Sequence, residues 1–184
     1  MASRRVTHPA RSGAAVLTFS LSVSFVILAA WLLLAVAGCS PSPQAGSEQV
    51  TIAGETWTFE VARDTPSRTR GLGGRASLPP QGGMMFIFPD AQVRSFWMYD
   101  CLMPIDVVFL DPLGVITATH SMPIEPPRAP EESEATYAGR LPLYSSRFPA
   151  QFALEFPAGT IDRLGLRPNT RIDLDPRRLK SLAR

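Results

Sequence analysis

The stretch "RSFWMYDCLMPIDVVFLD", Arg94–Asp111, decides the fold of this chain, because an acidic residue stands inside one of its apolar runs. The segment Ile105–Leu110 is rich in β-branched and aromatic residues, which favour a strand. Since side chains alternate between the two faces of a strand, Asp106 shares its face with Val108 and Leu110. A carboxylate on such a face needs a charged or hydrogen-bonding partner. The pattern therefore predicts a central strand with a buried polar contact.

Further short apolar runs on both sides of this strand are bounded by Gly and Pro turns. A hairpin is expected around Gly54, and residues 115–120 are expected to pair with the central strand across the turn "DPLG". The run "QFALEF", residues 151–156, alternates between two faces, with Glu155 on the face opposite the phenylalanines. The segment "RIDLD", residues 171–175, predicts a last strand.

Helical signals are few and short. Asp64 can cap a helix whose first positions include Pro66, and Gly71 is placed to end it. The residues from Ser121 to Tyr144 are rich in Pro and Glu and are expected to form a long exposed loop. Eight or so short strands with a turn or two of helix predict a mainly β fold. We expect a small antiparallel barrel or sandwich with one or two short helices.

The first 38 residues have the layout of an export signal, a basic start followed by an uncharged run from Ala14 to Gly38. The run ends in "VAGCS", which resembles the lipobox of bacterial lipoproteins and predicts lipidation of Cys39. The alternative is an uncleaved membrane helix, since about 20 apolar residues span a bilayer. Under either interpretation the chain is membrane-anchored and faces the periplasm or the cell exterior.

These features predict four segments along the chain. Residues 1–38 are the signal peptide or membrane anchor, and residues 39–48 are a flexible tether rich in Pro, Ser and Gly. Residues 49–176 form a single β domain. Residues 177–184 are a basic tail, expected to be solvated, although contact with anionic lipid is an alternative.

Charge and cysteine content exclude several classes of function. Three of the 18 basic residues lie in the leader, which leaves 15 against 16 acidic ones, so no nucleic-acid partner is expected. If Cys39 is lipidated, Cys101 has no disulfide partner; if it is not, the two could form a disulfide. Cys101 and His120 form the one possible thiol–imidazole pair after the leader, and a half-buried Cys with a surface His is the simpler interpretation. One Cys and one His are too few for zinc, so neither a metal nor a cofactor is expected.

Five motifs between Asp64 and Asp175 carry a family resemblance: "RGLGGR", "GGMMFIF", "SFWM", "MPIDVVFLD" and "FALEFPAG". Together they resemble the bacterial and archaeal family called domain of unknown function 192. The resemblance implies a compact, mainly β fold, often attached to an export signal or membrane anchor, and it implies no enzymatic activity. The chain departs from the family at Gly73, where a Met is common, and at Asp100 and Cys101, where an Asn-Thr pair is common.

Candidate site residues follow from the carboxylate in the central strand. Asp106 is expected to meet the guanidinium of Arg70 or Arg75, or to accept backbone N–H groups, and in both cases it organises structure. A functional alternative pairs Asp106 with Glu155 or Asp100, the two carboxylates that acid–base hydrolysis of a glycan needs.

The aromatic residues of "SFWMYD" suggest a second candidate. They are expected to be core, but if Trp97 and Tyr99 stay exposed they suit a sugar ring or an apolar peptide, with Asp100 at the rim. We therefore expect an envelope protein that acts as a binding or accessory module, with a small molecule, a glycan or an envelope protein as its ligand. A non-catalytic role is expected over an enzymatic one. The alternatives are a carboxylate-dependent hydrolase acting on envelope glycan and a structural lipoprotein.

Overall fold

The computed structural model describes residues 46–184. The expected signal segment, the expected lipidation site Cys39 and most of the expected tether lie outside the described residues. Within residues 46–184, no helix is long and apolar enough to cross a membrane.

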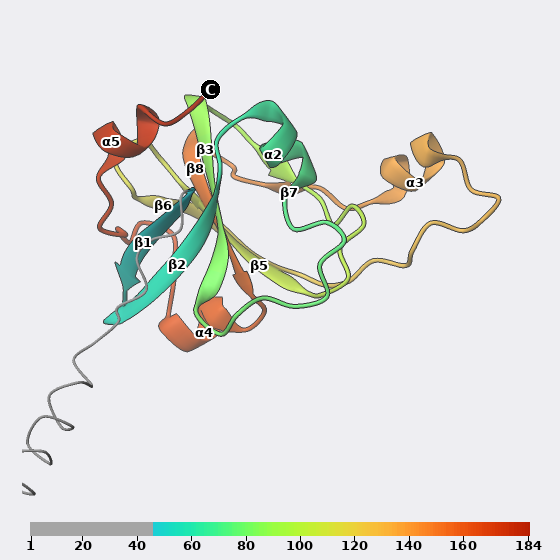
Figure 1. Cartoon of the computed structure of the whole chain (residues 1–184), viewed down its shortest axis with the longest axis horizontal. Coiled ribbons are helices and arrows are strands. Elements are labelled where there is room, and N and C mark those ends of the chain that lie inside the picture. The colour runs from blue at the N-terminus through green and yellow to red at the C-terminus, as the bar shows by residue number, and fades with distance from the viewer. Residues whose placement is uncertain (1–45) are drawn as a thin grey trace, which may run out of the picture. The chain divides into compact units, whose positions relative to one another are not determined.

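A six-stranded sheet forms the centre of the described domain, with the strands in the order β1-β2-β3-β8-β5-β6 (Figure 1). A separate two-stranded ladder joins β4 and β7. The mainly β fold with about eight strands is confirmed, and so are the hairpins β1–β2 and β5–β6. The strands are β1 (Ser47–Ile52), β2 (Glu55–Ala62), β3 (Gly82–Gln92), β4 (Ser95–Phe96), β5 (Ile105–Leu110), β6 (Ile116–Met122), β7 (Tyr144–Ser145) and β8 (Ala150–Pro157).

The sheet differs from the prediction in one strand pair and in its helices. β2 and β3 are parallel, because the chain crosses back through α2 before β3 begins. Within residues 46–184 the sheet keeps β1 and β6 as edges and does not close into a barrel. Four short helices are present instead of one or two: α2 (Thr65–Arg70), α3 (Glu134–Arg140), α4 (Thr160–Leu164) and α5 (Pro176–Lys180).

Helix α2 begins and ends where the sequence predicts. The Asp64 carboxylate accepts from the Ser67 N–H at 2.8 Å, and the Ser67 hydroxyl in turn accepts from the Asp64 N–H. Pro66 occupies the first turn, and Gly71 closes the helix at a positive φ of 50°. These contacts satisfy free N–H groups of the first turn and stabilise the start of α2.

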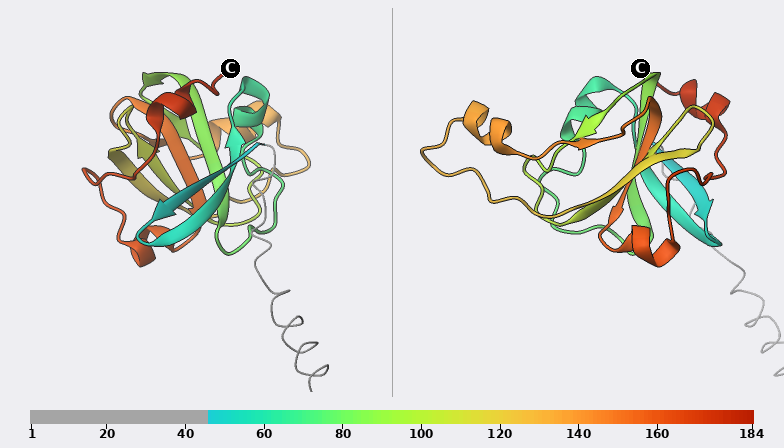
Figure 2. Two further views of the ribbon diagram at one scale, coloured as in Figure 1. Left: turned by 60° about the vertical axis from the view of Figure 1, so that its left-hand side comes forward. Right: turned by 180° about the vertical axis from the view of Figure 1, so that it is seen from behind.

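Both faces of the sheet are buried. One face of β8 is entirely apolar, while its other face also carries polar side chains. Helices α4 and α5 help cover the face that carries Trp57, Phe156 and Val108. Leu72, Met98 and Phe96 pack on the opposite face, beside Phe86 and Val107. Figure 2 shows α5 and α2 on different sides of the strands.

Two predicted segments differ in the structure. Residues 171–175 form no strand, and their pairing is the isolated bridge between Val115 and Arg171. The expected solvated tail instead contains α5, in which Leu179 is buried and Arg178 Nη1 donates to Glu48 Oε1 at 2.9 Å. Leu179, together with Leu182 and Ala183, packs this segment against the core.

The long loop after β6 is only partly exposed. It carries α3, whose Tyr137 is buried, and this segment extends away from the sheet in both Figure 1 and Figure 2. The expected exposed loop is therefore an arm with one anchored turn of helix, which returns to the body at Leu141.

Candidate functional site

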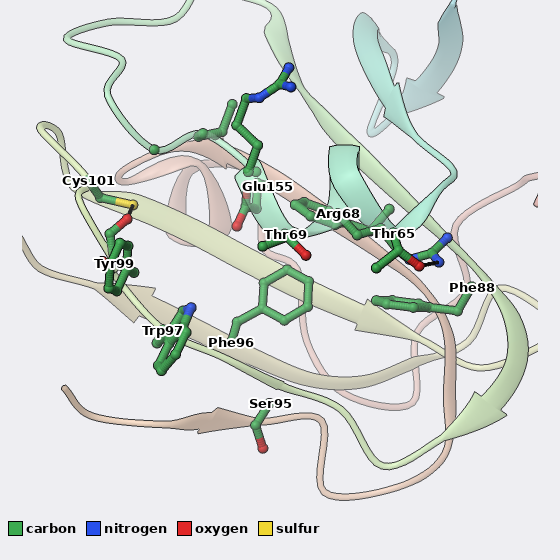
Figure 3. A pocket seen from close by; sticks show the side chains of 15 residues that line it. Thr65, Arg68, Thr69, Phe88, Ser95, Phe96, Trp97, Tyr99, Cys101 and Glu155 are labelled. Atoms are coloured by element: carbon green, nitrogen blue, oxygen red, sulfur yellow. Dashed lines mark hydrogen bonds between the residues drawn. The ribbon is translucent and has the colours of Figure 1, made fainter. Parts of the chain in front are cut away.

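A cavity of about 360 Å³ opens between α2 and residues 95–101, over the sheet face that carries Glu155. Figure 3 shows it from close by, with Thr69, Phe96 and Glu155 directed inward and Trp97 and Tyr99 at its edge. The volume is at the lower end of the range for small-ligand sites, which are typically apolar with a few polar groups. The apolar lining is mostly aromatic and consists of Leu72, Phe86, Phe88, Phe96, Trp97 and Tyr99.

Glu155 is the carboxyl group of this cavity. It lies on β8 opposite Met84 of β3 and Val107 of β5, and only 6 % of it is exposed. Within the described residues, its Oε2 is buried without a hydrogen-bond partner. Burial raises the pKa of Glu155 to about 8, although the nearby charge of Arg75 pulls it down. The carboxyl is therefore mostly protonated at neutral pH, and its O–H can donate to a ligand.

Trp97 and Tyr99 form the rim. Trp97 is 45 % exposed, and its ring lies 5.5 Å from that of Tyr99, which in turn lies 5.1 Å from the ring of Tyr137 on α3. The three rings make a row whose open end is Trp97. Because Met98 between them is buried, the two rim rings are held on one side of the chain.

The α3 arm holds this rim in place. The Tyr99 hydroxyl donates to Glu134 Oε1 at 3.0 Å, and the Asp100 N–H donates to the Tyr137 hydroxyl at 3.2 Å. Asp100 has a positive φ of 51°, and its carbonyl accepts from the Gly74 N–H. Asp100 thus shapes the turn but is not among the residues that line the cavity.

Two arginines of α2 make the cavity positive. Arg68 donates to the Ile87 carbonyl at 3.0 Å and lies over the Phe88 ring. The Arg70 carbonyl accepts from the Gly73 N–H, but the Arg70 guanidinium makes no hydrogen bond or ion pair with any residue from 46 to 184. With Glu155 protonated, these guanidinium groups disfavour a cationic ligand.

Gly73 also lines the cavity. A Cβ there would lie 3.1 Å from the Arg70 carbonyl oxygen and 3.4 Å from that of Tyr99. A side chain at this position would therefore crowd the backbone at the end of α2.

Cys101 lines the cavity as a neutral thiol. Its Sγ lies 3.6 Å from the Tyr99 carbonyl oxygen, and burial, with the charges of Glu155 and Asp100, raises its pKa to about 12. It does not pair with His120, whose Nε2 lies 2.7 Å from the Ser145 carbonyl oxygen. A thiol with so high a pKa is a poor nucleophile.

Asp106 lies on the opposite face of the sheet. Its cross-strand partner is Phe156, whereas that of Val107 is Glu155, so Asp106 and Glu155 point to opposite faces. The two cannot act as a pair on one substrate. Asp106 Oδ2 instead accepts from the Ile161 N–H of α4 at 2.8 Å, while its Oδ1 has no partner among the described residues.

The expected partners of Asp106 make other contacts. Arg75 pairs with Glu60, with Nη2 to Oε2 at 2.7 Å, and lines a neighbouring hollow of about 290 Å³. Arg70 lines both that hollow and the cavity of Glu155. Of the residues selected from the sequence, the structure thus brings together Glu155, Arg70, Trp97 and Tyr99, and leaves Asp106 and Asp100 outside.

Other residues of the cavity were missed in the sequence. Thr69 and Arg68 belong to a helix whose inner face could not be assigned, and Phe86 and Phe88 were taken as part of an undivided apolar run. The signal for the phenylalanines was available, because Met84, Phe86 and Phe88 alternate with Met85 and Ile87 along β3. Within the described residues, no group of three or more His, Cys, Asp and Glu could hold a metal ion.

Comparisons with known proteins give a family and a fold. The family model described as DUF192, Uncharacterized ACR, matches residues 48–174. No curated protein matches the chain. A solved candidate transcription regulator from Sinorhizobium meliloti 1021 is 31% identical, with a TM-score of 0.54 over 69% of this chain and 90% of that one. A protein of unknown function from Novosphingobium aromaticivorans DSM 12444 is 20% identical, with a TM-score of 0.54 over 74% of this chain and 100% of that one, and shares the fold.

Proposed function

This chain belongs to the DUF192 family of uncharacterised proteins, and we propose that it is a small-ligand-binding module of the cell envelope. In this proposal the domain is exported, anchored to the membrane through Cys39 or an N-terminal helix, and binds its ligand in the cavity beside α2. The leader and "VAGCS" motif support export and anchoring.

One observation carries the binding role: a buried carboxyl with an unpartnered oxygen forms the inner wall of a cavity that has exposed aromatic rings at its rim. Burying an unpaired polar group is costly, and a ligand that bonds to it recovers part of that cost. The exposed face of Trp97 offers stacking area to the same ligand. A purely structural lipoprotein needs neither feature.

The cavity supports binding over hydrolysis. Among the residues that line it, Glu155 is the one carboxyl group, whereas glycan hydrolysis by acid and base needs two. Asp106 cannot supply the second, since it faces the other side of the sheet. The thiol of Cys101 is held neutral and so provides no nucleophile.

The test is a screen of small envelope metabolites against the full-length protein in detergent, followed by ligand-observed NMR. Ligands that bind the cavity should lose binding in Trp97→Ala and keep it in Leu113→Ala, a matched control that is 64% exposed and does not line the cavity. Ligands that bind equally to both variants, with no ligand sensitive to Trp97, would refute the proposal.

A further inference from the structure

Resting on the proposed function, we infer that the cavity takes a 2-acetamido sugar, with its ring on Trp97 and its acetamido group directed inward to Glu155. The inference names the ligand class that the polar and apolar groups of the cavity fit together.

The inner end of the cavity presents a hydrogen-bond donor, so it fits a ligand that has an acceptor there. Glu155 is more than nine-tenths buried, and its Oε2 has no partner within residues 46–184. A protonated carboxyl donates one hydrogen bond, and an amide carbonyl is a strong neutral acceptor. An anionic acceptor is not required there, because the carboxyl itself is neutral: burial raises its pKa to about 8.

The cavity also offers contacts for the N–H and the methyl of an acetamido group. The Thr69 hydroxyl lines the cavity and makes no hydrogen bond within the described chain, so it can accept the amide N–H. The rings of Phe86 and Phe96, whose centroids are 4.7 Å apart, give the acetyl methyl an apolar surface. Figure 3 shows Thr69, Phe96 and Glu155 directed into the same space.

Size and charge exclude the alternatives. A cavity of about 360 Å³ has room for one ring with a short acyl group and not for a long acyl chain. A free amino sugar would place an ammonium beside Arg68 and Arg70, which line the same cavity. A plain hexose can offer Glu155 a hydroxyl oxygen, but it has neither an amide N–H for Thr69 nor a methyl group for the rings of Phe86 and Phe96.

The charged and titratable groups around Glu155 set the pH range of binding. Arg75 lowers the pKa of Glu155 and follows α2 in the chain, and Arg68 and Arg70 line the cavity from α2. Cys101 stays a thiol up to a pH of about 12. Glu155 is thus the group of the cavity that loses a proton near pH 8, and its donor is lost with that proton.

The experiment measures affinities of the full-length protein, in a detergent without a sugar head group, for N-acetylglucosamine, glucose and glucosamine. We expect N-acetylglucosamine to bind at least about tenfold more tightly than the other two at pH 6.5. The affinity should fall as the pH rises through about 8. In Glu155→Gln, whose amide still donates, affinity at pH 6.5 should stay within about threefold and show no such fall, whereas Glu155→Ala should lose about tenfold or more.

Two results separate this inference from the proposed function. Glucose that binds as tightly as N-acetylglucosamine, with both sensitive to Trp97→Ala, would overturn the acetamido inference and leave a binding site at Trp97. Trp97-sensitive binding of a ligand that is not a sugar, with no sugar bound, would do the same. No Trp97-dependent binding of any compound would refute both. Folding of each variant is checked by its thermal unfolding before the comparison.

Discussion

The buried Glu155 makes a sharp prediction about stability, through its replacement by glutamine. Its pKa is about 8 in the folded domain, against a usual value of 4.5. Above pH 5 this carboxyl is already mostly ionised in the unfolded chain, while the folded domain keeps the proton until the pH approaches 8. The unfolded state therefore binds fewer protons, so the free energy of unfolding falls by about 3 to 4 kcal/mol between pH 5 and pH 8, at about 1.4 kcal/mol per pKa unit.

Urea denaturation of wild type and Glu155→Gln at several pH values between 5 and 8.5 measures this pH-dependent fall in the free energy of unfolding. The variant should lack the decline, so the difference between the two proteins should change by about 3 kcal/mol in favour of glutamine. The amide is also expected to change the free energy of unfolding by an amount that does not depend on pH, and this constant difference has no bearing on the test. Glu131→Gln, at an exposed position, is the matched control and should follow the wild type. Parallel curves for wild type and Glu155→Gln would refute the burial of a proton at Glu155.

Three further predictions concern the rest of the chain. Asp106→Ala should lower the free energy of unfolding by about 1 to 3 kcal/mol, because the Ile161 N–H loses its buried acceptor, and Asp106→Asn should cost less; urea denaturation measures both, and an unchanged stability would mean that this contact does not hold α4 to the sheet. Leu179→Ala should cost about 2 to 5 kcal/mol by the same assay, since the side chain is 1% exposed, whereas Lys180→Ala at the neighbouring exposed position should change little. Cys39→Ser should abolish labelling by a lipid precursor and release the domain from membranes; attachment without label would indicate an uncleaved helix instead.

The strands and α2 could be predicted because their signals are local. Alternation along residues 151–156 assigns each side chain of β8 to a face, and Asp64 and Pro66 mark the start of α2. The parallel pair β2–β3 could also have been foreseen, since a helix between two strands permits a crossover. Residues 171–175 show the limit of this approach. They alternate as a strand does, but their pairing is a single bridge, between Arg171 and Val115 just before β6.

The partners within the site could not be predicted, because they depend on which elements cross the sheet. Alternation shows that Asp106 faces inward, but not that α4, and no arginine, covers that position. It places Glu155 on the face opposite the phenylalanines of β8, but it cannot show that α2 leaves a cavity there. The basic residues around Leu179 suggested a solvated segment, but Leu179, Leu182 and Ala183 pack on the core and hold the helix there.

The contrast between Gln151 and Glu155 links stability to binding. Both lie on the same face of β8 and both are buried, but the Gln151 amide donates to the Phe88 carbonyl, while Glu155 Oε2 has no partner among the described residues. At one position the protein satisfies its polar group, and at the other it leaves a proton facing a cavity. Because a ligand carbonyl bonded to that proton raises the pKa of Glu155 further, ligand stabilises the domain most where the carboxyl is protonated. The fall in the free energy of unfolding should therefore end, and the fall in affinity should begin, at the same pH near 8. Two different pH values would assign the two profiles to different groups.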